Sequence, residues 1–186
     1  MKKYLNPFSF MTLRTALCWG IAVLILTSIY FWQIGLRLTS LTQVNYLGDR
    51  LWAATLRQIV AWLLFSGVLY IIGIIASRSK IRFWDVAAYN LFARLPFDLS
   101  LLLFAIPTVR SVVGLLMEGI LETVMQYQNV LLLVGLVTSV LTVWYFVWSY
   151  FAFSVATNLK GGKGVALFIL GWLITYIASG FAMLMF

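Results

Sequence analysis

The sequence predicts an all-α fold: a polytopic membrane protein in which a bundle of five transmembrane helices is accompanied by a short interfacial amphipathic helix. Three observations predict it. Of the 186 residues, 63% are hydrophobic and only 10% are charged, which lies far from the usage of soluble domains. Five apolar runs reach the roughly 20 residues that a helix needs to cross a bilayer. These runs are continuous, whereas the strands of a membrane barrel alternate over about ten residues.

The whole chain, 1–186, is expected to form a single transmembrane helical domain, because the segments between the runs are too short for an aqueous domain. The predicted spans are approximately 15–36, 58–77, 85–107, 130–157 and 164–186. The first span begins after Lys2 and Lys3, as a secretion signal would, but it ends near Arg37 instead of at a small-residue cleavage site. We therefore interpret it as a retained helix.

The 13 basic residues are spread over the connecting segments, so the net charge of +8 reports membrane topology and not a nucleic-acid partner. If the N-terminus is cytoplasmic, most of them lie on the cytoplasmic side: Lys2, Lys3, Arg14, Arg78, Lys80, Arg82, Lys160 and Lys163. The opposite side holds fewer: Arg37, Arg50, Arg57 and Arg110. The positive-inside rule then predicts a cytoplasmic N-terminus and an external C-terminus.

The segment 112–127 has the pattern of an amphipathic helix on the outer surface. Glu118, Glu122 and Gln126 recur every four positions and share one helix face, while apolar residues cover the rest. A solvated polar face is the simpler interpretation of this pattern. The alternative is an acidic rim at the entrance of a substrate path.

Two other connecting segments are predicted to contact lipid headgroups. The segment 38–56 mixes polar and apolar residues, and its Tyr46 and Trp52 suit headgroup depth. The segment 158–164, Asn-Leu-Lys-Gly-Gly-Lys-Gly, is glycine-rich and basic but lacks the spacing of a phosphate-binding P-loop. Contact with anionic headgroups explains it better.

The third span carries the strongest chemical signal, because Asn90, Arg94 and Asp98 recur every four positions and share one helix face. If the helix enters the bilayer near Asp85, Arg94 lies about 14 Å deep at 1.5 Å per residue. An unpaired charge near the midplane costs at least about 2.5–3.5 kcal/mol. We therefore expect Arg94 and Asp98 to neutralise each other, directly or through another helix.

Pro96 lies within this pattern and has no N–H for the carbonyl of Phe92, so a kink is expected there. A bent span beside a buried charge marks the binding site of many transporters. Together with Tyr89, these residues form a candidate intramembrane binding site; the alternative is a pair that only locks helices together. A second register, in which 95–117 crosses instead, would place Arg94 at the interface, but Pro107 fits the end of a span better.

The fourth span has a second polar line, formed by Thr138, Thr142, Tyr145 and Ser149 at the spacing of one helix face. Small and hydroxylated residues allow close helix contacts and interhelical hydrogen bonds. We interpret the line as a helix-packing face. A water-lined path is the alternative.

The residue inventory argues against an enzyme, a metal site and a cofactor. The sequence contains no histidine, and Cys18 is its only cysteine. The commonest general base and zinc ligand are therefore absent, and no intramolecular disulfide can form. Apart from Asp98, the carboxylates fall in connecting segments or at span ends, so no nucleophile and base can be paired within the spans.

The order of these features resembles the Yip1 family of five-span membrane proteins. The resemblance rests on Asn6-Pro7-Phe8 near the N-terminus, on Tyr89 and Pro96 within AAYNLFARLP, and on the final hairpin across VATNLKGGKGVALFILG. It covers nearly the whole chain. It implies a five-helix bundle with a cytoplasmic N-terminus and no enzymatic activity, and eukaryotic members act in trafficking with Rab GTPases.

The sequence departs from eukaryotic members in lacking their long N-terminal region with an acidic DLYGP-type motif. The Rab-related role is therefore not carried over, and a prokaryotic member in the bacterial inner (plasma) membrane is expected. Two function classes remain. The first is a non-enzymatic membrane organiser whose partners are the lipid bilayer and itself or another membrane protein. The second is a small-molecule or ion transporter or channel that uses Arg94 and Asp98.

Overall fold

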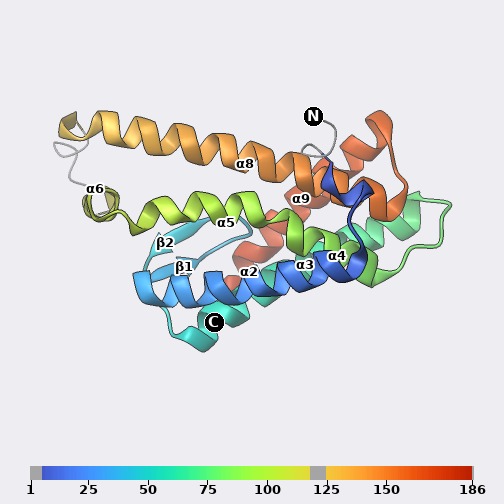
Figure 1. Cartoon of the computed structure of the whole chain (residues 1–186), viewed down its shortest axis with the longest axis horizontal. Helices are drawn as coiled ribbons and strands as arrows, with labels where there is room; N and C mark the ends of the chain where they lie inside the picture. Colours follow the sequence, from blue (N-terminus) through green and yellow to red (C-terminus); the bar gives the residue numbers. More distant parts are fainter. Residues whose placement is uncertain (1–5, 118–124, 186) are drawn as a thin grey trace.

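The computed structural model describes residues 6–117 and 125–185 and confirms the predicted all-α class, with five helices long and apolar enough to cross a membrane. Figure 1 shows the elements. In chain order they are η1 (Pro7–Ser9), α2 (Leu13–Ile34), β1 (Leu36–Leu38), β2 (Val44–Tyr46), α3 (Leu51–Ala76), α4 (Phe83–Ala93), α5 (Leu95–Leu101), η2 (Leu102–Ala105), α6 (Pro107–Met117), α8 (Gln128–Thr157) and α9 (Gly161–Met183).

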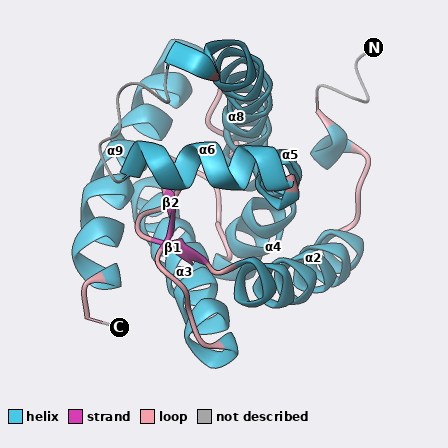
Figure 2. Ribbon diagram, turned by 90° about the vertical axis from the view of Figure 1, so that its left-hand side faces the viewer, coloured by secondary structure: helices cyan, strands magenta, loops and turns pink. Residues whose placement is uncertain are grey.

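The candidate spans are α2, α3, the segment Phe83–Ala105 that comprises α4, α5 and η2, α8 and α9. In the view along the bundle (Figure 2), α9, α3 and α2 follow one another in an arc, and α4 and α5 lie between this arc and α8. The most extensive contacts join α2 with α4, α3 with α9, and α8 with both α4 and α5. The third span is therefore the centre of the bundle.

Glycines allow the closest helix contacts. A Cβ atom on Gly20 of α2 would lie 2.7 Å from the Cγ atom of Leu91 on α4. A Cβ atom on Gly171 of α9 would lie 2.8 Å from methyl groups of Leu69 and Ile72 on α3. Both distances are far below van der Waals contact, so the two helix pairs can approach this closely only with glycine at these positions.

Between α2 and α3 the chain forms a β-hairpin that the sequence did not predict. Gly35 ends α2 in the left-handed conformation (φ 78°), and Leu36–Leu38 then pairs antiparallel with Val44–Tyr46. Leu36 and Leu38 are buried in the main core cluster. The segment 38–56, predicted to lie at headgroup depth, thus contains most of this hairpin, which lies between helices at one end of the bundle (Figure 2).

Hydrogen bonds hold the hairpin in this place. Ser179 of α9 accepts the backbone N–H of Leu41 (2.9 Å), and its hydroxyl lies 3.0 Å from the Ser40 hydroxyl. The hydroxyl of Tyr46 donates to the carbonyl of Phe104 (2.8 Å). Burial raises the pKa of Tyr46, against the opposing effect of Arg110, so the phenol stays protonated and keeps this bond.

The predicted amphipathic helix is described in part. Helix α6 begins at Pro107, earlier than expected, and lies across the end of the bundle in Figure 2. Val109 and Val112 are buried while Arg110 and Ser111 are exposed, as expected of an amphipathic helix. Glu118 and Glu122, on which the predicted polar face and acidic rim depend, lie outside the described residues, and Gln126 is exposed.

Candidate functional site

The candidate site lies where the third span is interrupted. Helix α4 ends at Ala93, and α5 begins at Leu95 with Pro96 in its first turn. Proline suits this position, because its missing N–H has no helical partner in a first turn. Arg94 forms the junction between the two helices, and its carbonyl accepts the backbone N–H of Asp98 (3.0 Å). This backbone bond closes one helical turn, which places Arg94 and Asp98 on the same helix face.

Arg94 and Asp98 form the expected direct ion pair. The Nε atom of Arg94 lies 3.2 Å from Oδ1 of Asp98, and the two side chains are only 8% and 6% exposed. The guanidinium carbon also lies 5.4 Å from the ring centre of Phe97, a cation–π contact. Phe97 in turn packs on Tyr145 of α8, with ring centres 5.8 Å apart. The pair is thus enclosed between α4–α5 and α8.

Several polar atoms around this pair lack a hydrogen-bond partner among the described residues. They are buried, and they include both amide atoms of Asn90, Nη2 of Arg94 and Oγ of Ser149. Each such group costs about 1–3 kcal/mol when it is left unpaired. The expected stack of Asn90, Arg94 and Asp98 therefore turns inward, but it is only partly satisfied by the protein itself.

A cavity of about 210 Å³ reaches Asp98 from the side of α2. Apart from Asp98 and Thr27, its lining is aliphatic: Val23, Leu26, Leu95, Leu99 and Leu102. Leu26, Leu99 and Leu102 are among the exposed apolar residues of the bundle surface. The cavity therefore opens towards lipid between α2 and α5, which does not suit the passage of a hydrated solute.

Tyr89 does not belong to the ion-pair site. Its hydroxyl donates to the carbonyl of Met11 (3.3 Å), and its ring packs edge-on against Phe8, with centres 5.6 Å apart. Phe8 is buried and also contacts Phe92 and Trp148. Tyr89 therefore holds the N-terminal turn against α4, which differs from its predicted place in the binding site.

The predicted packing face of α8 divides into two halves. Tyr145 and Ser149 are buried, in the part of α8 that faces α4 and α5. Thr138 and Thr142 are half-buried, and their hydroxyls donate to carbonyls of α8 itself, at 2.8 Å to Val134 and 2.7 Å to Thr138. Within the described part of the chain, the two threonines thus contribute no interhelical hydrogen bond.

Sequence analysis missed a second charged pair at the end of the bundle that carries the hairpin. Nε of Arg57 lies 2.9 Å from Oδ2 of Asp49, and Nη1 of Arg57 donates to the carbonyl of Met183 at the end of α9 (2.7 Å). Arg57 is buried because α3 begins at Leu51, seven residues before the predicted start of the second span. The helix-forming run Leu-Trp-Ala-Ala was the signal that could have located it.

Gln58, the next residue, links α3 to α2. Its Oε1 accepts the hydroxyl of Thr27 (2.8 Å), and its Nε2 donates to Ser28 (3.2 Å). All three side chains are buried. This satisfied polar cluster is a structural link, which contrasts with the unpaired atoms around Asn90.

Comparisons with known proteins add no relative. No family model matches the chain, and no curated protein or solved structure matches it either. The five apolar helices establish the class of the protein. The chain is a polytopic integral membrane protein. The resemblance to the Yip1 family stays a prediction from the sequence.

Proposed function

We propose that this integral membrane protein is a non-enzymatic membrane organiser, which works through helix contacts and not by moving a solute. The enclosed Arg94–Asp98 pair is the observation that carries the proposal. It is buried between α4–α5 and α8, and the cavity beside it has a mostly aliphatic lining. A transport site must meet water on at least one side, whereas a lock between helices need not.

The surface for such contacts is the exposed apolar face of α8. Only 6% of the hydrophobic stretch of this helix is buried, against 67% for the third span. Leu132, Leu136, Val140 and Val143 follow helical spacing on this surface and are all strongly exposed. The proposed partner is a second copy of the chain. Because α8 carries no charged residue, two copies of this face can meet without opposing like charges.

A cross-linking experiment in the native membrane tests this function. A photo-reactive phenylalanine analogue at Leu136 should give an adduct of twice the mass of the chain. The matched control is Leu26 on α2, which has the same exposed fraction of 65% and should react with lipid alone. Equal yields of the double-mass adduct from both positions, or none from Leu136, would contradict self-association through α8.

The second candidate is a transporter or channel for a small molecule or ion, favoured by the unpaired polar atoms of Asn90, Arg94 and Ser149. Such atoms need water or a polar ligand to complete their hydrogen bonds. This function requires that water reach Asn90 from one side of the membrane. The organiser requires that it does not.

For orientation, we propose a cytoplasmic N-terminus, an external C-terminus and residence in a bacterial inner (plasma) membrane. The arrangement of the connections in the bundle supports the predicted division of basic residues between its two ends. The α3–α4 and α8–α9 connections lie at the end of the bundle where α2 begins, and the hairpin and α6 lie at the other end (Figure 1). The more basic end is then cytoplasmic, as the positive-inside rule requires. The Yip1 resemblance supports the same orientation.

A further inference from the structure

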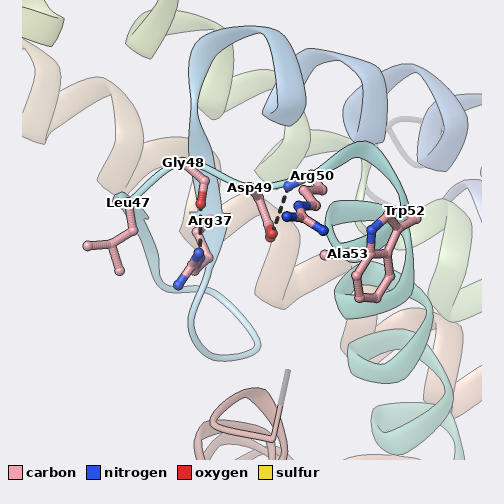
Figure 3. Close-up of a pocket in the computed structure, with 7 residues that line it drawn as sticks. All are labelled: Arg37, Leu47, Gly48, Asp49, Arg50, Trp52 and Ala53. Carbon is pink, nitrogen blue, oxygen red and sulfur yellow. Dashed lines mark hydrogen bonds between the residues drawn. The ribbon is translucent and has the colours of Figure 1, made fainter.

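A pocket opens at the hairpin end of the bundle, between the chain that leaves β2 and the first turn of α3 (Figure 3). Its volume is about 370 Å³. Its lining comes from two segments that are distant from the Arg94–Asp98 site: Arg37, Leu47, Gly48, Asp49, Arg50, Trp52 and Ala53. The proposed organiser function makes no use of this pocket.

The pocket has an excess of positive charge. Arg37 and Arg50 both line it, on either side of Asp49 in Figure 3. The Asp49 carboxylate is already engaged, because Oδ2 accepts Nε of buried Arg57 (2.9 Å) and Oδ1 accepts the backbone N–H of Arg50 (3.0 Å). Asp49 therefore neutralises Arg57, and the charges of Arg37 and Arg50 have no further carboxylate among the residues that line the pocket.

The backbone adds further donors. Helix α3 begins at Leu51, and its N-cap residue Arg50 makes no side-chain capping bond. Its first turn also carries no acidic residue. The N–H groups of this turn consequently lack a side-chain acceptor within α3, and they lie at the positive end of a 26-residue helix.

The pocket is built before any ligand arrives. Gly48 takes a left-handed conformation (φ 66°), its N–H donates to the carbonyl of Gly35 (2.9 Å), and its carbonyl accepts Nε of Arg37 (3.0 Å). Arg37 thereby uses its inner nitrogen on the protein and keeps its two outer nitrogens. An arginine oriented in this way loses little side-chain freedom when it binds an anion.

The depth of the pocket identifies the kind of anion. Trp52 and Leu47 line it and are 60% and 53% exposed, and the pocket lies at the end of a membrane-spanning helix. Tryptophan beside arginine at a span end is typical of headgroup depth. We propose that this pocket binds the phosphate of an anionic phospholipid headgroup, with Arg37 and Arg50 as the recognising side chains.

Native mass spectrometry of the full-length protein tests this site. The protein is purified in micelles that contain equal mole fractions of phosphatidylglycerol and phosphatidylcholine. We expect at least a five-fold excess of retained phosphatidylglycerol, and loss of this excess in the double variant Arg37→Gln, Arg50→Gln. The control variant Arg14→Gln, Arg78→Gln removes two exposed arginines at the other end of the bundle and should keep the excess.

Two further arms keep the test decisive. The single variant Arg50→Gln removes a side chain with no hydrogen bond inside the described structure, so its fold is kept and at least half of the excess should be lost. Glycerol phosphate and inorganic phosphate at millimolar concentration should leave the lipid in place. An excess equal in wild type and both pocket variants would overturn the proposal, as would displacement of the lipid by either soluble phosphate.

Discussion

The third and fourth spans differ most in what surrounds them. In the span Phe83–Ala105, 67% of the hydrophobic stretch is buried, and it carries the ion pair, the break at Pro96 and the unpaired amide of Asn90. In α8 the share is 6%, and its first half shows mostly apolar side chains outward. The third span is specified by polar contacts inside the protein. The fourth span is specified by its apolar surroundings, which are lipid and the proposed second copy of the chain.

Hydrophobicity and burial do not go together in a membrane protein. The more hydrophobic helix, α8, is the less buried one, because lipid is as good a solvent for leucine as the protein interior. Polar residues, by contrast, gain from facing inward. Substitutions in the third span should therefore alter stability much more than substitutions in α8.

The largest effect is expected from breaking the Arg94–Asp98 pair. Either Arg94→Ala or Asp98→Ala leaves one buried charge without its partner, which costs about 3–5 kcal/mol of unfolding free energy. The double variant removes both charges and should cost less than the larger single change. Unfolding in mixed micelles measures this cycle. Additive single effects would show that each residue has another partner and that the two charges do not stabilise the third span as a pair.

A smaller effect is expected from adding a methyl group at helix contacts. Gly20→Ala places a Cβ atom 2.7 Å from Leu91 on α4, and it should lower the unfolding free energy by about 1–3 kcal/mol. Gly135→Ala on α8 is the matched control, because its Cβ atom meets nothing within 4 Å. That variant should be neutral or stabilised by up to about 1 kcal/mol. Similar losses at both positions would remove the contrast between the two spans.

The least perturbing test concerns the ends of the same helices. Reporter fusions at Asn129, near the start of α8, and after Phe186 should both read as external. The physical reason is the unequal distribution of basic residues between the two ends. A cytoplasmic signal after Phe186 would mean that one of the five helices does not cross the membrane.

Sequence reasoning found the helices and the Arg94–Asp98 pair because both rest on local periodicity. Apolar runs and i, i+4 spacing are visible in one stretch of chain. The same reasoning missed the hairpin, whose strands have three residues each and are held by distant partners such as Ser179 and Phe104. It also assigned Arg57 to a connecting segment instead of α3 and missed its contacts, because its partners Asp49 and Met183 lie in other elements. Contacts between elements far apart in sequence leave no periodic trace.

For two candidate site residues, Tyr89 and Thr142, sequence spacing likewise did not predict the surroundings. Tyr89 is close to Arg94 in sequence, but the helix turns it towards Phe8 and Met11. Thr142 is predicted to share a face with Tyr145, yet it is only half-buried, and its hydroxyl donates to a carbonyl of its own helix. A helical face can be predicted from spacing. What covers the face depends on the packing of the whole bundle.

The proposed function requires that water does not reach the helix contact around Arg94 and Asp98, and thiol accessibility measures this. Single cysteines at Asn90, Thr142, Tyr145 and Ser149 on a Cys18→Ser background are exposed to a membrane-impermeant maleimide in right-side-out and in inside-out vesicles. The reactive control is an exposed position on the accessible side, Ser111→Cys at the hairpin end or Ser79→Cys at the other end. We expect full reaction at the control, weak labelling at most at Asn90 from the cytoplasmic side, and almost none at the other three. Strong labelling of Asn90 and Ser149 that a solute suppresses would contradict the lock and establish a water-filled transport site.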